Sequence, residues 1–195
     1  MTMPRGTKAE LRRLAAELRL EVGAGNDGVF DPFALAKLYG VTVIEMSTVA
    51  SEESREYFGA AGYSKFSGAQ IPVGPFGSVI LVNDLHPMTR VRSTLGHELA
   101  HVVREHPHAA RLVDENGCRT DNRVHEEEAD FLSGELLLPT DVARKLAIRG
   151  MSAAAVADMY GISEPMARWR LNISGGHQIR RRASIRQTGS AHRQS

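Results

Sequence analysis

The sequence of 195 residues is poor in cysteine and in long apolar runs, and each shortage excludes a class of protein. Cys118 is the only cysteine, so no intrachain disulfide can form, which is typical of a protein in a reducing compartment. No apolar run approaches the roughly 18 residues of a membrane span, and the charged N-terminal stretch lacks the apolar centre of a signal peptide. We therefore expect a cytoplasmic protein without a membrane partner.

An excess of one charge is also lacking, because 24 Lys and Arg balance 23 Asp and Glu. The balance is uneven along the chain. Residues 176–195 contain five arginines and no acid, which leaves 19 basic and 23 acidic residues, a net charge of −4, in residues 1–175. A body of this sign has no general attraction for nucleic acid, so DNA binding is not favoured, although a local basic face remains open.

What the sequence does have is the patterning of a folded α+β domain. Hydrophobic residues make up 42% and charged residues 24%, as in ordinary globular proteins. Apolar residues at three- and four-residue steps predict helices, and β-branched runs between glycine and proline predict strands. The expected helices are Lys8–Val22, Pro32–Gly40, Met88–Arg104, Val124–Leu138, Val142–Arg149, Ser152–Tyr160 and Glu164–Leu171. The expected strands are Val41–Met46, Glu56–Phe66 and Ser78–Val82.

One motif in the expected helix Met88–Arg104 indicates chemistry. His97-Glu98-Leu99-Ala100-His101 is an H-E-x-x-H pattern. Residues four apart lie one turn above each other on a helix, so His97 and His101 can bind one tetrahedral Zn²⁺ while Glu98 stands beside the attacking water. The pattern is short, and two surface histidines around a solvated glutamate would also produce it.

A second expected helix carries acidic residues with complementary spacing. Glu126 and Asp130 are four residues apart on one face. Glu126 can supply the third metal ligand, and Asp130 can accept the free N–H of a ligating histidine and so fix its tautomer. Glu128 is an alternative ligand. Acidic residues also favour the N-terminal turn of a helix for reasons of the helix dipole alone.

These two motifs together resemble a known family. GHELAHVVREH, followed after a loop by HEEEADFLSGELLLP, resembles the ImmA/IrrE family of zinc-dependent metallopeptidases, and flanking segments extend the resemblance over about residues 8–174. By position, His97 and His101 match the histidine ligands, Glu98 the catalytic glutamate and Glu126 the third ligand. The sequence departs from the family pattern in three residues that affect packing, namely Leu132, Ser133 and Leu138.

The resemblance implies a fold, a domain division and a substrate. It implies a zincin-like fold in which helices pack on a small mixed sheet and the zinc helix lies below an edge strand, expected at Ser78–Val82. Residues 1–150 would form the zinc metallopeptidase domain and residues 151–174 a short helix-turn-helix-like extension packed on it. Residues 175–195 lie beyond the resemblance and are expected to be a disordered basic tail, because they lack apolar periodicity and are rich in Arg, Ser, Gln and Gly. Members of the family characteristically cut a helix-turn-helix repressor once, which implies a Cro/CI-like repressor as the protein substrate.

Several other residues have simpler interpretations. His106 and His108 are expected in a loop or at a helix end rather than as ligands, because three protein ligands and water fill a catalytic zinc site. His86 is expected in a turn, Cys118 in a loop and Trp169 in the core. An oxyanion needs a hydrogen-bonding or positive partner, for which three residues remain open. These are Tyr160, Arg168 and Arg170.

A second function class competes with the protease. Ala153–Leu171 has the spacing of a helix-turn-helix and contains Arg168 and Arg170, and the basic tail follows it. The alternative is therefore a non-proteolytic DNA- or protein-binding regulatory module with a structural zinc site. The acidic body, together with the presence of both zinc motifs, favours the protease.

Overall fold

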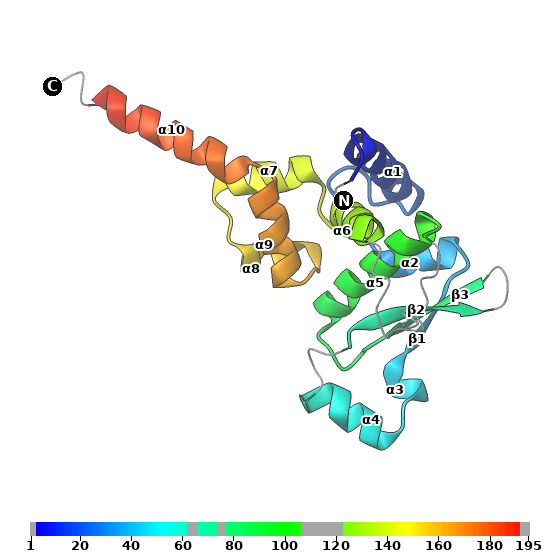
Figure 1. Ribbon diagram of the computed structural model, residues 1–195. Coiled ribbons are helices and arrows are strands. Elements are labelled where there is room, and N and C mark those ends of the chain that lie inside the picture. Colours follow the sequence, from blue (N-terminus) through cyan, green and yellow to red (C-terminus); the bar gives the residue numbers. More distant parts are fainter. Residues whose placement is uncertain (1–2, 62–65, 74–76, 107–122, 192–195) are drawn as a thin grey trace.

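The computed structural model describes residues 3–61, 66–73, 77–106 and 123–191, and it confirms the α+β class (Figure 1). The helices are α1 (Thr7–Glu21), α2 (Pro32–Leu38), α3 (Met46–Val49), α4 (Glu52–Glu56), α5 (Met88–Val103), α6 (Arg123–Leu137), α7 (Thr140–Arg149), α8 (Ala153–Tyr160), α9 (Glu164–Ile173) and α10 (Gly176–Ala191). A π-helical turn, η1, spans Tyr57–Ala61. The strands are β1 (Thr42–Glu45), β2 (Gly68–Val73) and β3 (Gly77–Val82).

The sheet has the order β1-β3-β2, with β1 parallel and β2 antiparallel to β3. The expectation that Ser78–Val82 forms the edge strand is therefore wrong, because β3 lies in the centre. The edge strand beside α5 is β2, which forms an antiparallel hairpin with β3. The parallel strands β1 and β3 are joined by a crossover connection. Pro72 lies in β2. Proline has no N–H to donate to a ladder, and an edge strand tolerates it because one side of such a strand has no partner strand.

The expected strand Glu56–Phe66 is also wrong in its described part. Ser51 caps α4 through a hydrogen bond from the Ser54 N–H, and the chain continues helically into η1. A serine at the N-cap followed by acidic residues is a helix start signal that outweighed the aromatic residues further on. Residues 62–65 lie outside the described part.

Helix α5 lies at the centre of the fold. It packs on β2 and β3 on one side and on α6 on another, and α1 covers α6 (Figure 1). The leucines at these contacts are fully buried, and each contributes about 1.5–3 kcal/mol to folding. They are Leu11 and Leu18 in α1, Leu95 and Leu99 in α5, and Leu132 and Leu136 in α6. The described helices include none long and apolar enough to cross a membrane.

Gly68 allows β2 to approach α5 closely. A Cβ at this position would lie 2.6 Å from Thr94 Cγ2 and 3.0 Å from the Leu81 carbonyl oxygen. Only glycine fits such a contact without displacing the strand. The free edge of β2 is thereby held against the part of α5 that carries Glu98.

Helices α7, α8 and α9 follow α6 and are anchored to it by a buried ion pair. Arg170 of α9 is fully buried, and its Nη2 lies 2.9 Å from Oε1 of Glu135 in α6. Arg170 Nε also donates to the Leu138 carbonyl at 2.8 Å, and Thr140 donates to the same carboxylate. Burial alone would raise the pKa of Glu135, but the charge of Arg170 and these hydrogen bonds lower it overall.

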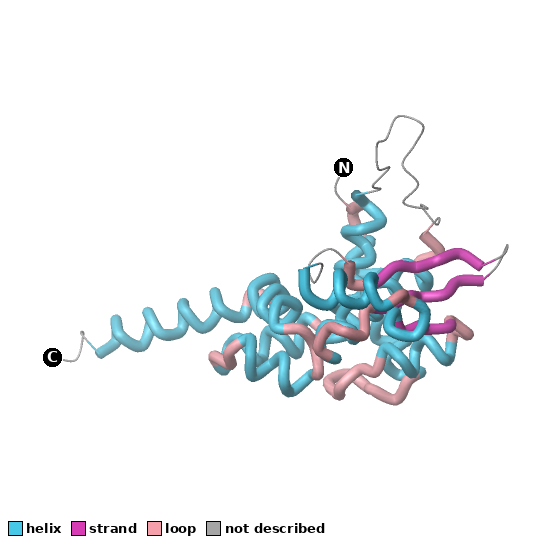
Figure 2. Tube along the Cα trace, turned by 90° about the horizontal axis from the view of Figure 1, so that it is seen from below, coloured by secondary structure: helices cyan, strands magenta, loops and turns pink. Residues whose placement is uncertain are grey.

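The C-terminal segment differs from the expected disorder, because residues 176–191 form α10. Its start packs on α7, where a Cβ at Gly176 would lie 2.6 Å from Ala147 Cβ, and the remainder extends away from the other helices (Figures 1 and 2). Arginine, alanine and glutamine favour helix, so a helix forms here without the apolar periodicity that sequence reasoning requires. Residues 192–195 lie outside the described part.

The buried ion pair makes a prediction about stability. Arg170→Met should lower the free energy of unfolding by about 3 kcal/mol, because it leaves the Glu135 carboxylate buried without its main partner. The loss is at the lower end of the usual range since Arg12 Nε stays 3.5 Å from Glu135. Arg168→Met is the matched control, because the exposed pair of Arg168 with Glu164 is worth less than about 1 kcal/mol.

The effect should also depend on pH with a definite sign. The pKa of Glu135 is depressed in the folded protein, so its stabilising contribution is present above the unfolded value of about 4.3 and is lost as the pH falls through the folded value. The stability difference between wild type and Arg170→Met, measured by urea unfolding, should shrink below about pH 4. Equal losses for Arg170→Met and Arg168→Met would contradict this account.

Candidate metal centre

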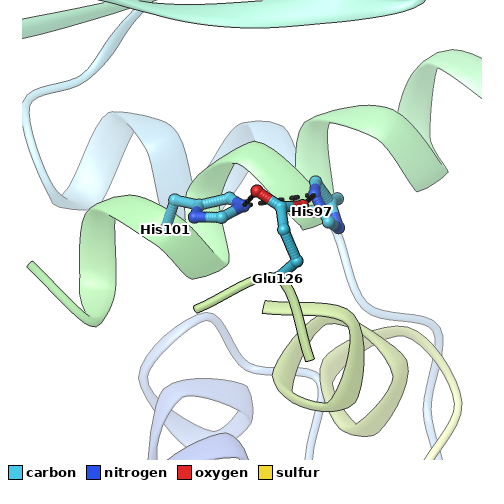
Figure 3. Close-up of side chains that lie close together, drawn as sticks. All are labelled: His97, His101 and Glu126. Carbon is cyan, nitrogen blue, oxygen red and sulfur yellow. Dashed lines mark hydrogen bonds and ion pairs between the residues drawn. The ribbon is translucent and has the colours of Figure 1, made fainter. Parts of the chain in front are cut away.

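The candidate site lies where α5 packs on α6. His97 and His101 lie one turn apart on α5, and Glu126 projects from the first turn of α6 toward both (Figure 3). The leucines of both helices are buried at the same contact, so the polar side chains are held at its rim. The His97 and His101 side chains are only 23% and 14% exposed, which leaves one open side for a ligand.

The distances in this cluster suit a tetrahedral metal ion. His97 Nε2 and His101 Nε2 are 3.2 Å apart, and the Glu126 oxygens lie 3.4 Å from His97 Nε2 and 3.5 Å from His101 Nε2. Ligands bound tetrahedrally at about 2.0–2.1 Å are separated by about 3.3 Å. Among the described residues, His97, His101 and Glu126 are the ones whose ligand atoms gather at such spacing.

The charges of this cluster also favour a cation. Burial alone would lower the pKa of His97, but its interactions with Asp130 and Glu126, with a further contribution from Glu98, raise that pKa to about 10. The pKa of Glu126 is lowered by its interactions with His101 and His97. The site thus stabilises positive charge at the imidazoles, and a bound divalent cation can take the place of that proton.

Asp130 lies where the sequence predicts it. Its Oδ1 is 3.1 Å from His97 Nδ1, on the side of the ring opposite Glu126. A carboxylate there accepts the Nδ1–H of His97 and leaves Nε2 free to bind metal. Asp130 thereby orients one candidate ligand and favours the tautomer with its proton on Nδ1.

Glu128, the alternative ligand, faces a different group. It is buried, and its Oε2 lies 3.0 Å from Arg104 Nη2 and 3.3 Å from His106 Nε2. Two residues along a helix rotate a side chain by about 200°, so Glu126 and Glu128 cannot point to one place. The structure therefore supports Glu126 in the cluster and assigns Glu128 other partners.

Glu98 lies on the side of α5 that faces the sheet. It is 7% exposed, and its Oε2 accepts a hydrogen bond from the Gln70 backbone N–H at 3.2 Å. This N–H therefore points away from β3, toward the free edge of β2. The carboxylate is held between the edge strand and the histidines, where a general base for a hydrolytic reaction is needed.

A pocket of about 670 Å³ opens beside His97. Its walls come from the first half of α5, from the residue before β2 and from the start of α9, and include Arg90, Thr94, Ser67 and Pro165. The pocket adjoins both the metal cluster and the edge strand. It is large enough for substrate side chains next to a reacting bond.

The three candidate oxyanion partners lie elsewhere. Tyr160 is buried and donates to the Asp27 carbonyl at 3.3 Å, Arg170 is bound to Glu135, and Arg168 pairs with Glu164. Trp169 is half-buried beside Arg170. His86 is buried in the turn before α5. His108 and Cys118 lie outside the described residues.

His106 is the residue that sequence reasoning undervalued. It was expected at a helix end, and it does follow α5, but it is buried, with its Nδ1 3.0 Å from His101 Nδ1. No spacing rule connects two histidines five residues apart, because the contact depends on how the chain turns after α5. Burial lowers the pKa of His106, an effect opposed by Glu128.

Comparison with known protein families finds a match over most of the chain. The family model described as the IrrE N-terminal-like domain matches residues 36–172, which include the sheet and both helices of the metal cluster. The family is one of peptidases, so the match supports a metallopeptidase-type function and confirms the resemblance of the motifs. A search of curated proteins found no match.

The geometry predicts how much metal the protein binds and through which residues. We expect about one metal ion per chain after loading with Zn²⁺, and we expect His97→Ala and His101→Ala each to abolish tight binding. Glu126→Ala should weaken binding more than Glu128→Ala, because only Glu126 lies among the ligand atoms. Elemental analysis and chelator competition measure both. Less than about a tenth of a metal ion per chain after loading would refute the site, and the reverse order of the glutamate variants would transfer the ligand role to Glu128.

Proposed function

The chain belongs to the IrrE N-terminal-like domain family, and from this membership we propose that it is a zinc-dependent, site-specific endopeptidase. The observation that carries the proposal is the cluster of His97, His101 and Glu126, with ligand atoms at tetrahedral spacing beside the buried Glu98. Two imidazoles and one carboxylate leave a fourth position open, which distinguishes a catalytic zinc site from a structural one.

The reaction divides between the metal and the protein. Bound Zn²⁺ supplies a Lewis acid that activates water and polarises the scissile carbonyl. Glu98 takes the proton of the attacking water and passes it to the nitrogen of the leaving amine, so the same carboxylate acts first as base and then as acid. Before substrate binds, the Gln70 N–H holds this carboxylate in place through its bond to Oε2.

The edge strand offers a place for an extended peptide substrate. The Gln70 N–H points away from β3, beyond the free edge of the sheet. In an antiparallel strand the carbonyl of the same residue points to the same side, so both groups can pair with an added strand. A peptide that pairs with β2 would replace the contact with Glu98 by a strand–strand hydrogen bond and would pass beside His97. The pocket next to His97 would then receive a side chain of that peptide.

We propose a Cro/CI-like helix-turn-helix repressor in the cytoplasm as the protein substrate, following the family that the two motifs resemble. A single cut in such a repressor would release its genes from repression. Co-expression with a repressor encoded by a neighbouring gene tests the substrate, with mass spectrometry of the products to locate the bond. A repressor that stays intact beside zinc-loaded protein would contradict this choice of substrate.

A DNA-binding module remains the second candidate, and the structure weakens it. Helices α8 and α9 have helix-turn-helix spacing, but Arg170 is fully buried and Arg168 pairs with Glu164. Of the two arginines in this segment, Arg170 is therefore unavailable to DNA, and Arg168 is paired at the surface. A salt-dependent gel shift that survives a chelator would favour the module, whereas chelator-sensitive cutting favours the protease.

Glu98→Gln separates catalysis from metal binding. The amide keeps the volume of the side chain but cannot take a proton at neutral pH, and general acid–base help is typically worth about 10²–10⁴ in rate. The variant should bind Zn²⁺ and repressor as the wild type does, yet show no cut over an assay of hours. Zinc content, pull-down and cleavage are measured on one preparation.

Glu127→Gln is the matched control for this experiment. Glu127 is adjacent to the ligand Glu126 but pairs with Arg123, so the same chemical change there should leave cutting unchanged. Cutting by Glu98→Gln at a near wild-type rate would show that the protein does not use Glu98 as its base.

A further inference from the structure

The two candidate histidine ligands are held in different ways. His97 donates its Nδ1–H directly to a carboxylate, that of Asp130. The Nδ1 of His101 meets no carboxylate and instead lies 3.0 Å from Nδ1 of His106. We propose that His106 is a positioning residue for the metal site, which fixes the tautomer and the orientation of His101. This inference rests on the proposed metal site.

Only one placement of the protons on the two neutral rings allows His101 to bind a metal through Nε2 and to form a hydrogen bond with His106. His101 Nε2 faces the metal position, so the proton of the neutral ring resides on Nδ1. His106 Nδ1 must then accept that N–H, which places the proton of His106 on its Nε2. The His106 Nε2–H donates to Glu128 Oε2, at 3.3 Å. The chain of donors thus runs from His101 through His106 to a buried carboxylate.

Arg104 completes this arrangement by holding Glu128. Its Nε donates to Glu128 Oε2 at 3.1 Å, its Nη2 lies 3.0 Å from the same oxygen, and its Nη1 donates to Glu10 of α1 at 2.9 Å. Glu128 and His106 are only 8% and 7% exposed, so neither is oriented by solvent. The ring of His125 stacks on His106, with centroids 4.4 Å apart. The His106 ring is consequently held by three neighbours, namely His101, Glu128 and the stacked ring of His125.

The backbone after α5 is shaped to bring His106 back to His101. Glu105 has φ of 48°, the left-handed conformation that is uncommon for a residue other than glycine. The His106 N–H donates to the His101 carbonyl at 3.1 Å, which is the six-to-one bond of a Schellman helix end. His106 thus binds His101 through both its backbone and its side chain. Backbone strain persists where the surroundings require it, and such positions are concentrated at functional sites.

The test compares three substitutions at position 106 in the full chain. His106→Leu removes both polar atoms, His106→Asn keeps an oxygen near the position of Nδ1, and His106→Gln moves it toward the position of Nε2. Chromophoric chelator competition with Zn²⁺ measures the dissociation constant of each. Loss of a group that orients a ligand typically costs about 10–100-fold in metal affinity, which we expect for Leu and Gln but not for Asn.

Glu105 offers a control substitution, and the protonation of the imidazole nitrogens can be measured directly. Glu105→Gly relieves the left-handed residue without removing a donor, so it should bind Zn²⁺ as the wild type does. Nitrogen-15 NMR of the wild-type imidazoles, with and without Zn²⁺, should show His106 protonated at Nε2 and unprotonated at Nδ1. Thermal unfolding of the metal-free variants identifies any that fail to fold, and the NMR result then decides.

The outcomes distinguish this inference from the function on which it rests. Unchanged affinity in His106→Leu, equal affinities of the Asn and Gln variants, or His106 protonated at Nδ1 would each overturn the role of His106 while leaving the metal site intact. A wild-type chain that binds no Zn²⁺ would overturn both. A chain that shows the predicted affinities and cuts no repressor would support the role of His106 and contradict the proposed substrate.

Discussion

Helices α5 and α6 pack along their apolar faces, and this contact sets the separation between the histidines of one and the carboxylates of the other. Both helices enter the contact with fully buried leucines, so their axes cannot slide without opening cavities in a close-packed core. The backbone positions of the polar residues at the rim are therefore set by the hydrophobic core, and contacts between the polar groups then orient the side chains. The sheet and α1 cover the remaining faces of the pair, and this support makes spacings within a few tenths of an ångström of a tetrahedron possible.

The cost of this arrangement is an electrostatic imbalance. Glu98, Glu126 and Asp130 all lie close to His97, and their charges account for the raised pKa of that histidine. Without a cation, two Nε2 atoms at 3.2 Å must share a proton or repel each other. A divalent ion would resolve both conflicts, since it would neutralise the carboxylates and bind both nitrogens. The buried pair of Arg170 with Glu135, by contrast, is already balanced and serves the fold alone.

The site residues that could be predicted from the sequence are those related by local helical spacing. The pairing of His97 with His101 follows from a four-residue step, and that of Glu126 with Asp130 follows from the same step on α6, while Glu98 follows from its place in the H-E-x-x-H pattern. The positions that sequence reasoning missed depend on contacts between segments that are distant in the chain. The strand β2 contains Gly68 and Pro72, which weaken any strand pattern, and its role as the edge depends on the crossover that places β3 in the centre. Arg170 looked available for DNA or an oxyanion because nothing local shows that Glu135 lies beside it.

Glu126 and Glu128 show how one short stretch of sequence serves two purposes. The helical rotation between them points Glu126 at the open side of His97 and His101, and points Glu128 toward the end of α5, where Arg104 and His106 lie. In the proposed site, a carboxylate on each side of α6 would therefore act on the same metal cluster, Glu126 as a ligand and Glu128 through the intervening imidazole of His106. The contact from Glu128 through His106 to His101 depends on the turn after α5. That turn requires Glu105 in the left-handed conformation, which is unfavourable for residues other than glycine. A local conflict of this kind is expected where tertiary structure imposes a functional geometry.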